Sequence, residues 1–407
     1  MHFLPFSSFG AAVVVTVVAA NTASGYTTAS TAQTDQLAAV ALGKLSVYAV
    51  ANASPGPRPK CTLANAAKRR EWGSLSTNQR KDYTRAVKCL MNKPSRFDPV
   101  EVPGAKSRFD DFVAVHINQT LGIHGTANFL SWHRYFTWAY EQALRTECGY
   151  QGYQPYWNWG RWAQNPLDSP LFDGSASSMG GNGAFAPHNC TNALPTGLNC
   201  IPPGNGGGCV ASGPFADMSV NLGPISLTLV GIPGLEPIDF ATAPGGLLAY
   251  NPRCLRRDIS SWVSQRWSTD RNSTDLITQS NDIVTFQTTM QGDFAAGDYG
   301  VHAAGHFTIG GDPGGDLFTS PGDPVFYLHH AQIDRTWWIW QNQKPAERTN
   351  AIGGPVSLFD PPPVANGTLQ DLVDLGPLTT PAAGAVPIAK LMSTVGLAGS
   401  PMCYIYV

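Results

Sequence analysis

Seven of the nine histidines in this chain fall into two clusters, and clustered imidazoles imply metal chemistry more directly than any other feature of the sequence. The clusters are His116, His124 and His133, and then His302, His306, His329 and His330. Imidazole binds copper, zinc, iron and nickel, so histidine alone does not identify the metal. Three ligands from each cluster would make two metal sites.

Motifs that are missing narrow the choice of metal. The sequence contains no HExxH motif of zinc proteases, no Glu-x-x-His pair of a di-iron bundle beside these histidines, and no CxxCH haem site. Two histidine trios without carboxylates favour copper. We therefore predict a dinuclear centre with two copper ions per chain, which could handle dioxygen.

The first cluster lies in a stretch whose pattern predicts two helices. Ser107 begins a capping-box pattern, and the apolar residues that follow recur at three- and four-residue steps together with His116, which should point inward. Glycines on both sides of His124 break this pattern and place it on a loop. A second helix over residues 128–149, with Asn at its start and Gly at its end, carries His133.

The second cluster is also predicted to lie on helices. His302 and His306 are four residues apart, so they share one helix face and could bind one ion. Pro324 suits the first turn of another helix, with Asp323 as its cap, and this helix carries the adjacent pair His329 and His330.

Only one residue of that adjacent pair can join the site, because neighbours on a helix face about 100° apart. Asp334 lies one turn beyond His330, where its carboxylate could orient the ring, and His329 has no comparable partner. We predict that His330 is the ligand and that His329 lies beside the metal or lines the substrate pocket.

Three runs of sequence resemble a known family. FLSWHRYFTWAYEQAL, PYWNW (155–159) and DPVFYLHHAQIDRTWW are similar to the tyrosinase, catechol oxidase and haemocyanin family of type 3 copper proteins, above all its short secreted fungal members. The resemblance extends from about Ser107 to Trp340. It implies a mainly α fold, a four-helix bundle core that holds a dinuclear copper site, with long ordered loops and minor β. It also implies the ligands His116, His124 and His133 for copper A, and His302, His306 and His330 for copper B.

Departures from the family pattern bear on the reaction. Gly122 stands where many fungal members carry a thioether-forming cysteine, so no thioether is expected. Members that hydroxylate monophenols well often have Asn or Asp directly after the first copper B histidine, where it helps a carboxylate hold a water that deprotonates the phenol. Ala303 cannot do this. The carboxylate position itself could be Gln287, Gln291 or Asp293.

Two further residues are assigned to the substrate pocket. Leu317 matches the family's gate position above copper A, where a bulky Phe restricts entry in some members, so moderately open access is expected. Phe326 could stack on an aromatic substrate or belong to the core.

The predicted enzyme is a polyphenol oxidase of the catechol oxidase or tyrosinase type. It would convert o-diphenols to o-quinones with O2 and hydroxylate monophenols weakly or slowly. The alternatives are a true tyrosinase, an o-aminophenol oxidase, a haemocyanin-like oxygen carrier and a metal-free binding glycoprotein.

The low charge of the chain suits an enzyme that binds small neutral aromatic substrates. The formal charge of the 407 residues is −2 and only 13% of them are charged, which gives no reason to expect binding to nucleic acid or a membrane. The one basic cluster, residues 68–70, is interpreted as a solvated helix face. The oligomeric state is left open.

One catalytic domain, residues 21–407, is expected because the predicted ligands extend from His116 to His330. An apolar run ahead of it predicts a signal peptide over residues 1–20. Helical segments are expected over 34–51 and 62–91. The chain closes with CYIYV, similar to the family's tyrosine motif, so no C-terminal shielding domain is expected.

The cysteines and sequons favour a secreted glycoprotein. An even count of eight cysteines in a chain with a leader predicts disulfides: Cys61, Cys89, Cys148, Cys190, Cys200, Cys209, Cys254 and Cys403. Five sequons predict glycosylation at Asn52, Asn118, Asn189, Asn272 and Asn366. His188, beside one of these cysteines, is expected on the surface.

Overall fold

In the computed structural model, both histidine clusters lie on four helices at the centre of a mainly helical fold, as predicted. The structure describes residues 28–53, 61–192, 200–223, 239, 241–358, 363–379 and 384–407. The predicted signal peptide at 1–20 lies outside the described residues. The helices are α1 (Ala32–Ala51), α2 (Thr77–Met91), α3 (Arg108–Ile123), α4 (Phe129–Cys148), α5 (Ser261–Trp267), α6 (Asp270–Gln279), α7 (Ile283–Gln291), α8 (Gly300–Ile309), α9 (Phe326–Gln343) and α10 (Pro345–Arg348).

The strands are short and, among the described residues, form two-stranded sheets only. They are β1 (Ala67–Arg69), β2 (Gly183–Phe185), β3 (Thr191–Asn192), β4 (Cys200–Ile201), β5 (Gly207–Val210), β6 (Ser219–Leu222), β7 (Tyr250–Cys254), β8 (Leu372–Val373), β9 (Val386–Pro387) and β10 (Tyr404–Tyr406). β1 and β10 pair in parallel; the pairs β2–β5, β3–β4, β6–β7 and β8–β9 are antiparallel.

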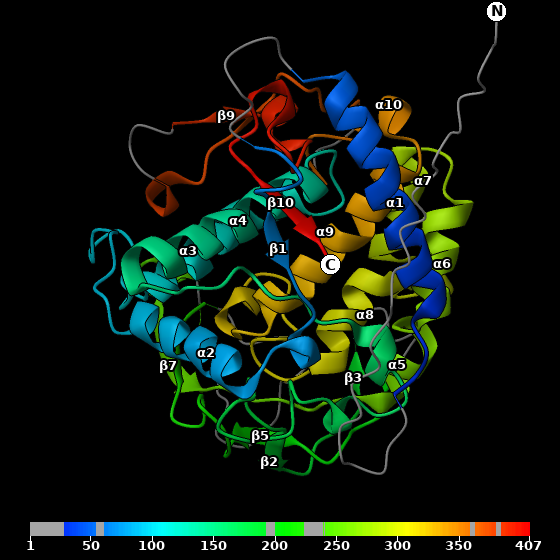
Figure 1. Cartoon of the computed structure of the whole chain (residues 1–407). Helices are drawn as coiled ribbons and strands as arrows, with labels where there is room; N and C mark the ends of the chain where they lie inside the picture. The colour runs from blue at the N-terminus through cyan, green and yellow to red at the C-terminus, as the bar shows by residue number, and fades with distance from the viewer. Residues whose placement is uncertain are drawn as a thin grey trace, which may run out of the picture.

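Helix α9 forms the axis of the molecule. Every residue of α9 except Gln343 is buried, and a helix that is covered on all sides must lie in a core. α9 packs against α1, α4, α6, α8 and α10, and Figure 1 shows α1 running alongside it. One continuous hydrophobic cluster extends from Ala41 of α1 to Tyr406 of β10.

Local signals set the ends of the helices that carry the first histidine cluster. Ser107 and Asp110 form the predicted capping box, in which each side chain accepts the other residue's backbone N–H. Gly149 ends α4 in the left-handed conformation at φ 65°. Asn128 precedes α4 as predicted, but its side chain does not cap the helix.

The segment expected to be helical over 62–91 is only partly so, and this prediction needs correction. α2 begins at Thr77, and Ala67–Arg69 forms strand β1 beside β10; Figure 1 shows the two strands together near the centre. Arg69 is therefore buried between charged and aromatic groups and is not part of a solvated helix face. The pairing joins residues more than three hundred positions apart, so no local pattern could indicate it.

The start of α9 also differs from the prediction. The helix begins at Phe326, and Pro324 lies ahead of it in a turn. Asp323 still accepts a hydrogen bond from the Val325 N–H at 3.0 Å, but its carboxylate mainly forms a buried ion pair with Arg257, at 2.7 Å. A buried guanidinium requires a partner of opposite charge, so the ion pair with Arg257 is the main contact of the Asp323 carboxylate.

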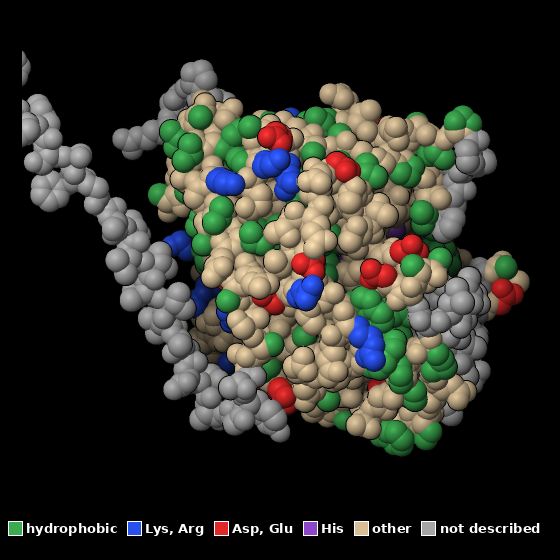
Figure 2. All heavy atoms as spheres, turned by 90° about the vertical axis from the view of Figure 1, so that its right-hand side faces the viewer, with side chains coloured by type: hydrophobic (Ala, Val, Ile, Leu, Met, Phe, Trp, Pro, Cys, Tyr) green, Lys and Arg blue, Asp and Glu red, His purple; other side chains and the backbone are tan. Residues whose placement is uncertain are grey.

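All eight cysteines pair, which confirms the predicted disulfides. The bridges join Cys61 to Cys403, Cys89 to Cys148, Cys190 to Cys200, and Cys209 to Cys254. On the face shown in Figure 2, acidic and basic side chains are sparse and interspersed. Within the described ranges, no helix combines the length and the apolar character that a bilayer crossing requires.

Candidate metal centre

The first trio of histidines converges as the sequence predicts. His116 lies on α3, His124 is the residue that ends α3, and His133 lies on the first turns of α4. Their ring centroids are 5.1 to 5.7 Å apart. One nitrogen of each ring lies within 4.8 Å of one nitrogen of each of the others, close enough for a single ion.

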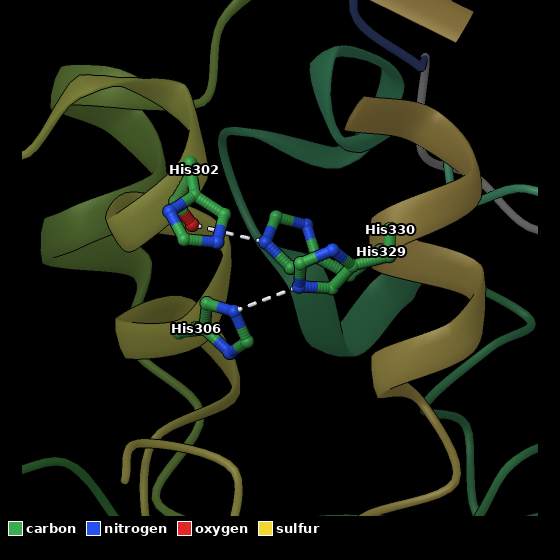
Figure 3. A group of neighbouring side chains, drawn as sticks. All are labelled: His302, His306, His329 and His330. Atoms are coloured by element: carbon green, nitrogen blue, oxygen red, sulfur yellow. Dashed lines mark hydrogen bonds between the residues drawn. The ribbon is translucent and has the colours of Figure 1, made fainter. Parts of the chain in front are cut away.

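The second cluster is brought together by α8 and α9. His302 and His306 project from α8 toward His329 and His330 on α9, as Figure 3 shows. The Nε2 atoms of His306 and His330 are 3.2 Å apart. The ring centroids of His302, His306 and His330 are 4.9 to 5.3 Å apart.

The two trios face each other. The rings of His133 and His330 are stacked with centroids 4.6 Å apart, and those of His124 and His302 with centroids 6.2 Å apart. Two ions held by these trios would therefore lie side by side and could act on one small molecule.

Backbone carbonyls hold the imidazoles so that their free nitrogens point inward. The Nδ1 atoms of four rings lie 2.7 to 3.1 Å from carbonyl oxygens, in the pairs His116–Phe318, His124–Thr120, His133–Phe129 and His306–Gly314. The Nε2 atoms of His116, His133 and His302 are buried and have no hydrogen-bond partner. Buried polar atoms are rarely left unpaired, so these orphaned nitrogens fit metal ligation.

The protonation state of the rings also suits a metal. Burial lowers the pKa of all seven clustered histidines, to about 4 for His124 and His306 and well below 6.5 for the other five. Neighbouring histidines lower several of these pKa values further. The imidazoles are neutral at physiological pH, and neutral imidazole is the form that binds a metal.

His329 has the contacts of a ring that supports the ligands. Its Nε2 lies 2.9 Å from the carbonyl oxygen of His302, and its ring stacks on the His302 ring. A Cβ atom at Gly305 would lie 2.1 Å from the His329 ring, so glycine is required where α8 passes over it. The His330 ring instead stacks on His133 of the other trio, and its Nε2 lies 3.2 Å from the Nε2 of His306, which favours His330 as the third ligand of this trio.

The contact expected between Asp334 and His330 is absent, so this part of the prediction was wrong, although the geometry still favours His330 as the ligand. Asp334 makes no hydrogen bond to His330, whose Nδ1 has no partner. Its carboxylate instead accepts from Arg134, Tyr404 and Tyr406 at 2.5 to 2.6 Å. Helical spacing alone cannot show that cationic and hydroxyl groups from distant segments compete for this carboxylate.

Phe326 and Ala303 are both buried. Phe326 stacks on His330 with centroids 4.0 Å apart and also touches the rings of His116 and His306. It therefore packs against the ligands, which favours the core alternative over substrate stacking. Ala303 directly follows His302 and presents only a methyl group, with 7% of the residue exposed.

Leu317 remains exposed, at 45%, one residue before the carbonyl that holds His116. In Figure 2 a recess on the displayed face shows a small area of histidine at its bottom. An exposed leucine beside the His116 anchor is compatible with the predicted gate.

The three residues considered for the carboxylate position have other contacts. Gln287 donates to the Gly353 carbonyl at 2.6 Å, and Asp293 caps a short turn on the surface. Gln291 accepts from the Gly125 N–H at 2.7 Å and so ties α7 to the backbone beside His124. No local pattern predicts this tie, because the two residues belong to segments that lie far apart in the sequence.

His188 is not the surface residue that was expected. Its side chain is 3% exposed, with Nε2 2.8 Å from a carboxylate oxygen of Asp258 and Nδ1 2.7 Å from the Ala186 carbonyl. Asp258 also accepts from the N–H groups of Gly204 and Gly206. These contacts fasten the disulfide-containing loop to the segment before α5.

Comparisons with known proteins agree with this geometry. The sequence model described as the common central domain of tyrosinase matches residues 106–343. Tyrosinase P of Aspergillus terreus is 40% identical over 358 residues, which cover 86% of this chain and 94% of that protein. The N-acetyl-6-hydroxytryptophan oxidase of Emericella nidulans is 36% identical, with coverages of 85% and 94%.

A solved structure is also similar. A polyphenol oxidase variant from Thermothelomyces thermophila superposes with a TM-score of 0.83 at 42% identity, covering 92% of this chain and 98% of that one. Tyrosinases bind copper and act on phenols with O2, and both histidine trios fall within the matched domain. The chain therefore belongs to the tyrosinase family of type 3 copper proteins and is an oxidoreductase.

Proposed function

We propose that this protein holds two copper ions and oxidises o-diphenols to o-quinones with O2, with weak or slow hydroxylation of monophenols. The observation that carries the proposal is the pair of opposed histidine trios, in which the Nε2 atoms of His116, His133 and His302 are buried and unpartnered. His116, His124 and His133 would hold one ion, and His302, His306 and His330 the other. When bound, the copper pair supplies redox chemistry: it passes electrons from substrate to O2.

The electron count fits this assignment. Each o-diphenol loses two electrons and two protons on becoming an o-quinone, and O2 takes up four of each on becoming two waters, so two diphenols are oxidised per O2. The chain's own residues position the substrate and exclude water. Phe326 and Phe129 pack against ligand rings and keep the centre apolar, which strengthens electrostatic interactions inside it.

The preference for diphenols rests on Ala303. Hydroxylation of a monophenol requires that its hydroxyl proton be removed, and the methyl group of Ala303 can neither accept that proton nor hold a water that does. An o-diphenol is easier to oxidise and depends less on such help. Access past the exposed Leu317 would be moderately open.

Paired initial rates test this preference. The copper-loaded protein should oxidise 4-methylcatechol much faster than it hydroxylates 4-methylphenol, and Ala303→Asn should raise the monophenol rate relative to the diphenol rate severalfold. Copper content measured on the same samples serves as the control for loading. An unchanged ratio in Ala303→Asn would show that the water-holding argument does not apply.

A second candidate is oxidation of another hydroxylated aromatic, such as an o-aminophenol or a hydroxyindole. The relative from Emericella nidulans, 36% identical, is named for a hydroxytryptophan substrate, which favours this alternative. Catechols, o-aminophenols and 6-hydroxyindoles compared at equal concentration would separate the candidates by kcat/KM.

We also propose that the protein is secreted and glycosylated. Four disulfides are typical of proteins that fold in an oxidising compartment. The sequon residues Asn52, Asn118, Asn189 and Asn366 are exposed, and Asn272 is half-buried in the capping box of α6. Mass spectrometry of the protein from a glycosylating host would identify the occupied sites.

A further inference from the structure

One loop supplies backbone acceptors to both trios. The chain leaves α8 at Ile309 and runs through residues 310–319 before it approaches α9. Within this loop the Gly314 carbonyl lies 3.1 Å from Nδ1 of His306, and the Phe318 carbonyl lies 2.8 Å from Nδ1 of His116. One imidazole of each trio is thus oriented by the same ten residues.

The other two imidazoles with anchored Nδ1 atoms do not depend on this loop. His124 and His133 are held by the carbonyls of Thr120 and Phe129, each four residues earlier in its own segment. Those anchors join residues only four positions apart. The anchors of His116 and His306, in contrast, exist only while the loop keeps its conformation.

The carboxylate of Asp316 holds this conformation. One of its oxygens accepts from the Phe318 N–H at 2.8 Å, from the Thr319 N–H at 2.7 Å and from the Thr319 hydroxyl at 2.8 Å. The Asp316 N–H donates to the Pro313 carbonyl at 2.9 Å. Asp316 therefore lies between the two carbonyls that face the histidines: its carboxylate fixes the turn at residues 318 and 319, and its main-chain N–H fixes the turn at residue 313.

The loop needs such a restraint. Four of its first six residues are glycine, and two of these, Gly310 and Gly311, have φ of 61° and 69°. Glycine loses more conformational freedom on ordering than any other residue. Leu317, in the middle of the turn, is exposed and adds little packing.

We propose that Asp316 is a positioning residue for both copper sites, because its carboxylate fixes the turn whose carbonyls at 314 and 318 orient His306 and His116. The inference rests on the proposed function, since it concerns the ligands of that centre. Some groups orient a ligating imidazole through its second nitrogen. Removal of such a group typically lowers metal affinity about 10- to 100-fold.

The charge of Asp316 is costly to the fold, which supports a positioning role. Burial raises the pKa of Asp316 to about 6, the hydrogen bonds from Thr319 and Phe318 oppose this shift, and nearby Asp312 adds to it. Asp312 is itself paired with Arg253 of β7. Since the folded pKa exceeds the unfolded one, this group favours folding more at pH 4 than at pH 7.

Copper release tests the proposal. Asp316→Ala, Asp316→Asn, Asp173→Ala and the wild type are loaded with copper and dialysed against a chelator, and copper per chain is followed over time. Asp173 is the control. It is exposed, and its carboxylate accepts a similar hydrogen bond within a turn, from the Ser175 N–H, but that turn holds no histidine.

We expect Asp316→Ala to release both ions about 10- to 100-fold faster than the wild type. Asp316→Asn and Asp173→Ala should behave like the wild type, since the amide oxygen of Asn can accept the same three bonds. Wild-type retention in Asp316→Ala, a stable plateau at one copper, or equally fast loss from Asp316→Asn or Asp173→Ala would overturn the proposal. If Asp316→Ala does not fold, Thr319→Val, which removes one of the three donors, should still release copper severalfold faster, and a wild-type rate would count against the proposal.

Thermal unfolding of the metal-free proteins gives a readout that is independent of copper. The Tm of Asp316→Asn minus that of the wild type should be more positive at about pH 7.5 than at about pH 5, and a difference that does not change with pH would overturn the buried-carboxylate account. A wild type that binds no copper or oxidises no phenol would defeat the proposed function itself. A wild type with two coppers, matched by Asp316→Ala, would defeat only this inference.

Discussion

His329 and His330 are adjacent in sequence and both buried, but their contacts differ in kind. His329 faces the carbonyl of His302 and fills the space left by Gly305. His330 faces the Nε2 of His306 and the ring of His133. A helix turns about 100° per residue, so His329 meets the backbone of α8 while His330 meets the rings of His306 and His133.

This difference predicts opposite results for the two alanine variants. His330→Ala should bind about one copper per chain and lose oxidase activity, because it removes one of only three ligands of its ion. His329→Ala should keep two coppers, with reduced stability from the cavity it leaves. His133→Ala should also lose activity, because it removes one of the three ligands of the other ion.

Elemental analysis of copper and far-ultraviolet circular dichroism of the same samples would check this prediction. The dichroism serves as the control, since an unfolded variant also loses metal. Full copper in His330→Ala together with loss from His329→Ala would reverse the ligand assignment.

At the scale of elements, the sequence predicted well the features that neighbouring residues determine. The capping box at Ser107 and the left-handed Gly149 each depend on contacts within a few residues, and both are present. The convergence of His116, His124 and His133 followed from the same local signals.

Several features that local patterns did not predict depend on distant partners. Strand β1 exists because β10 pairs with it, and Asp334 turns away from His330 because Arg134 and two tyrosines compete for it. His188 is buried because Asp258, seventy residues away, accepts its ring N–H. Hydrophobic periodicity and spacing carry no signal for such pairs, so these contacts could not be predicted.

The buried pair of Arg134 and Asp334 ties two of the ligand helices together. Arg134 follows His133 on α4, and Asp334 lies one turn beyond His330 on α9. Burial alone would raise the pKa of Asp334, but Arg134, Arg69 and two tyrosine hydroxyls lower it below its ordinary value, so the carboxylate is ionised. Removal of one partner from a buried ion pair leaves the other charge without compensation.

Asp334→Asn should therefore lower the free energy of unfolding by about 3–5 kcal/mol. Urea unfolding of the metal-free protein measures this change. Asp275→Asn is the matched control, because the exposed ion pair of Asp275 with Arg271 on α6 should contribute less than about 1 kcal/mol. A loss from Asp334→Asn no larger than that of the control would contradict the tie between α4 and α9.

At the scale of the whole molecule, seven buried neutral imidazoles make the metal-free protein sensitive to acid. Their folded pKa values are lowered, to about 4 for His124 and His306 and well below 6.5 for the others, whereas unfolded histidine titrates near 6.5. Between these values the unfolded chain binds more protons than the folded one. Stability must then fall as the pH falls from about 6.5 to 4.

Among the described residues, carboxyl groups with raised pKa values act in the opposite direction but are fewer. Burial raises the pKa of Glu71 and Asp110, and that of Asp316 to about 6, so these groups favour the fold as the pH falls. For His124 and His306, whose folded pKa is about 4, the loss of stability in acid is on the order of 3 kcal/mol each. Seven imidazoles outweigh three carboxyl groups, so the net effect of acid should be destabilising.

The Tm of the metal-free protein should therefore drop steeply between about pH 6.5 and pH 4.5, and the copper-loaded protein should resist this change, because bound metal keeps the imidazoles deprotonated. Differential scanning calorimetry of both forms across this range would measure the two curves. His329→Ala supplies the control, since removal of one buried imidazole that is not a predicted ligand should make the drop shallower in the metal-free form. A metal-free Tm that stays constant down to pH 5 would mean that water or counter-charges reach the seven rings and that burial does not keep them neutral.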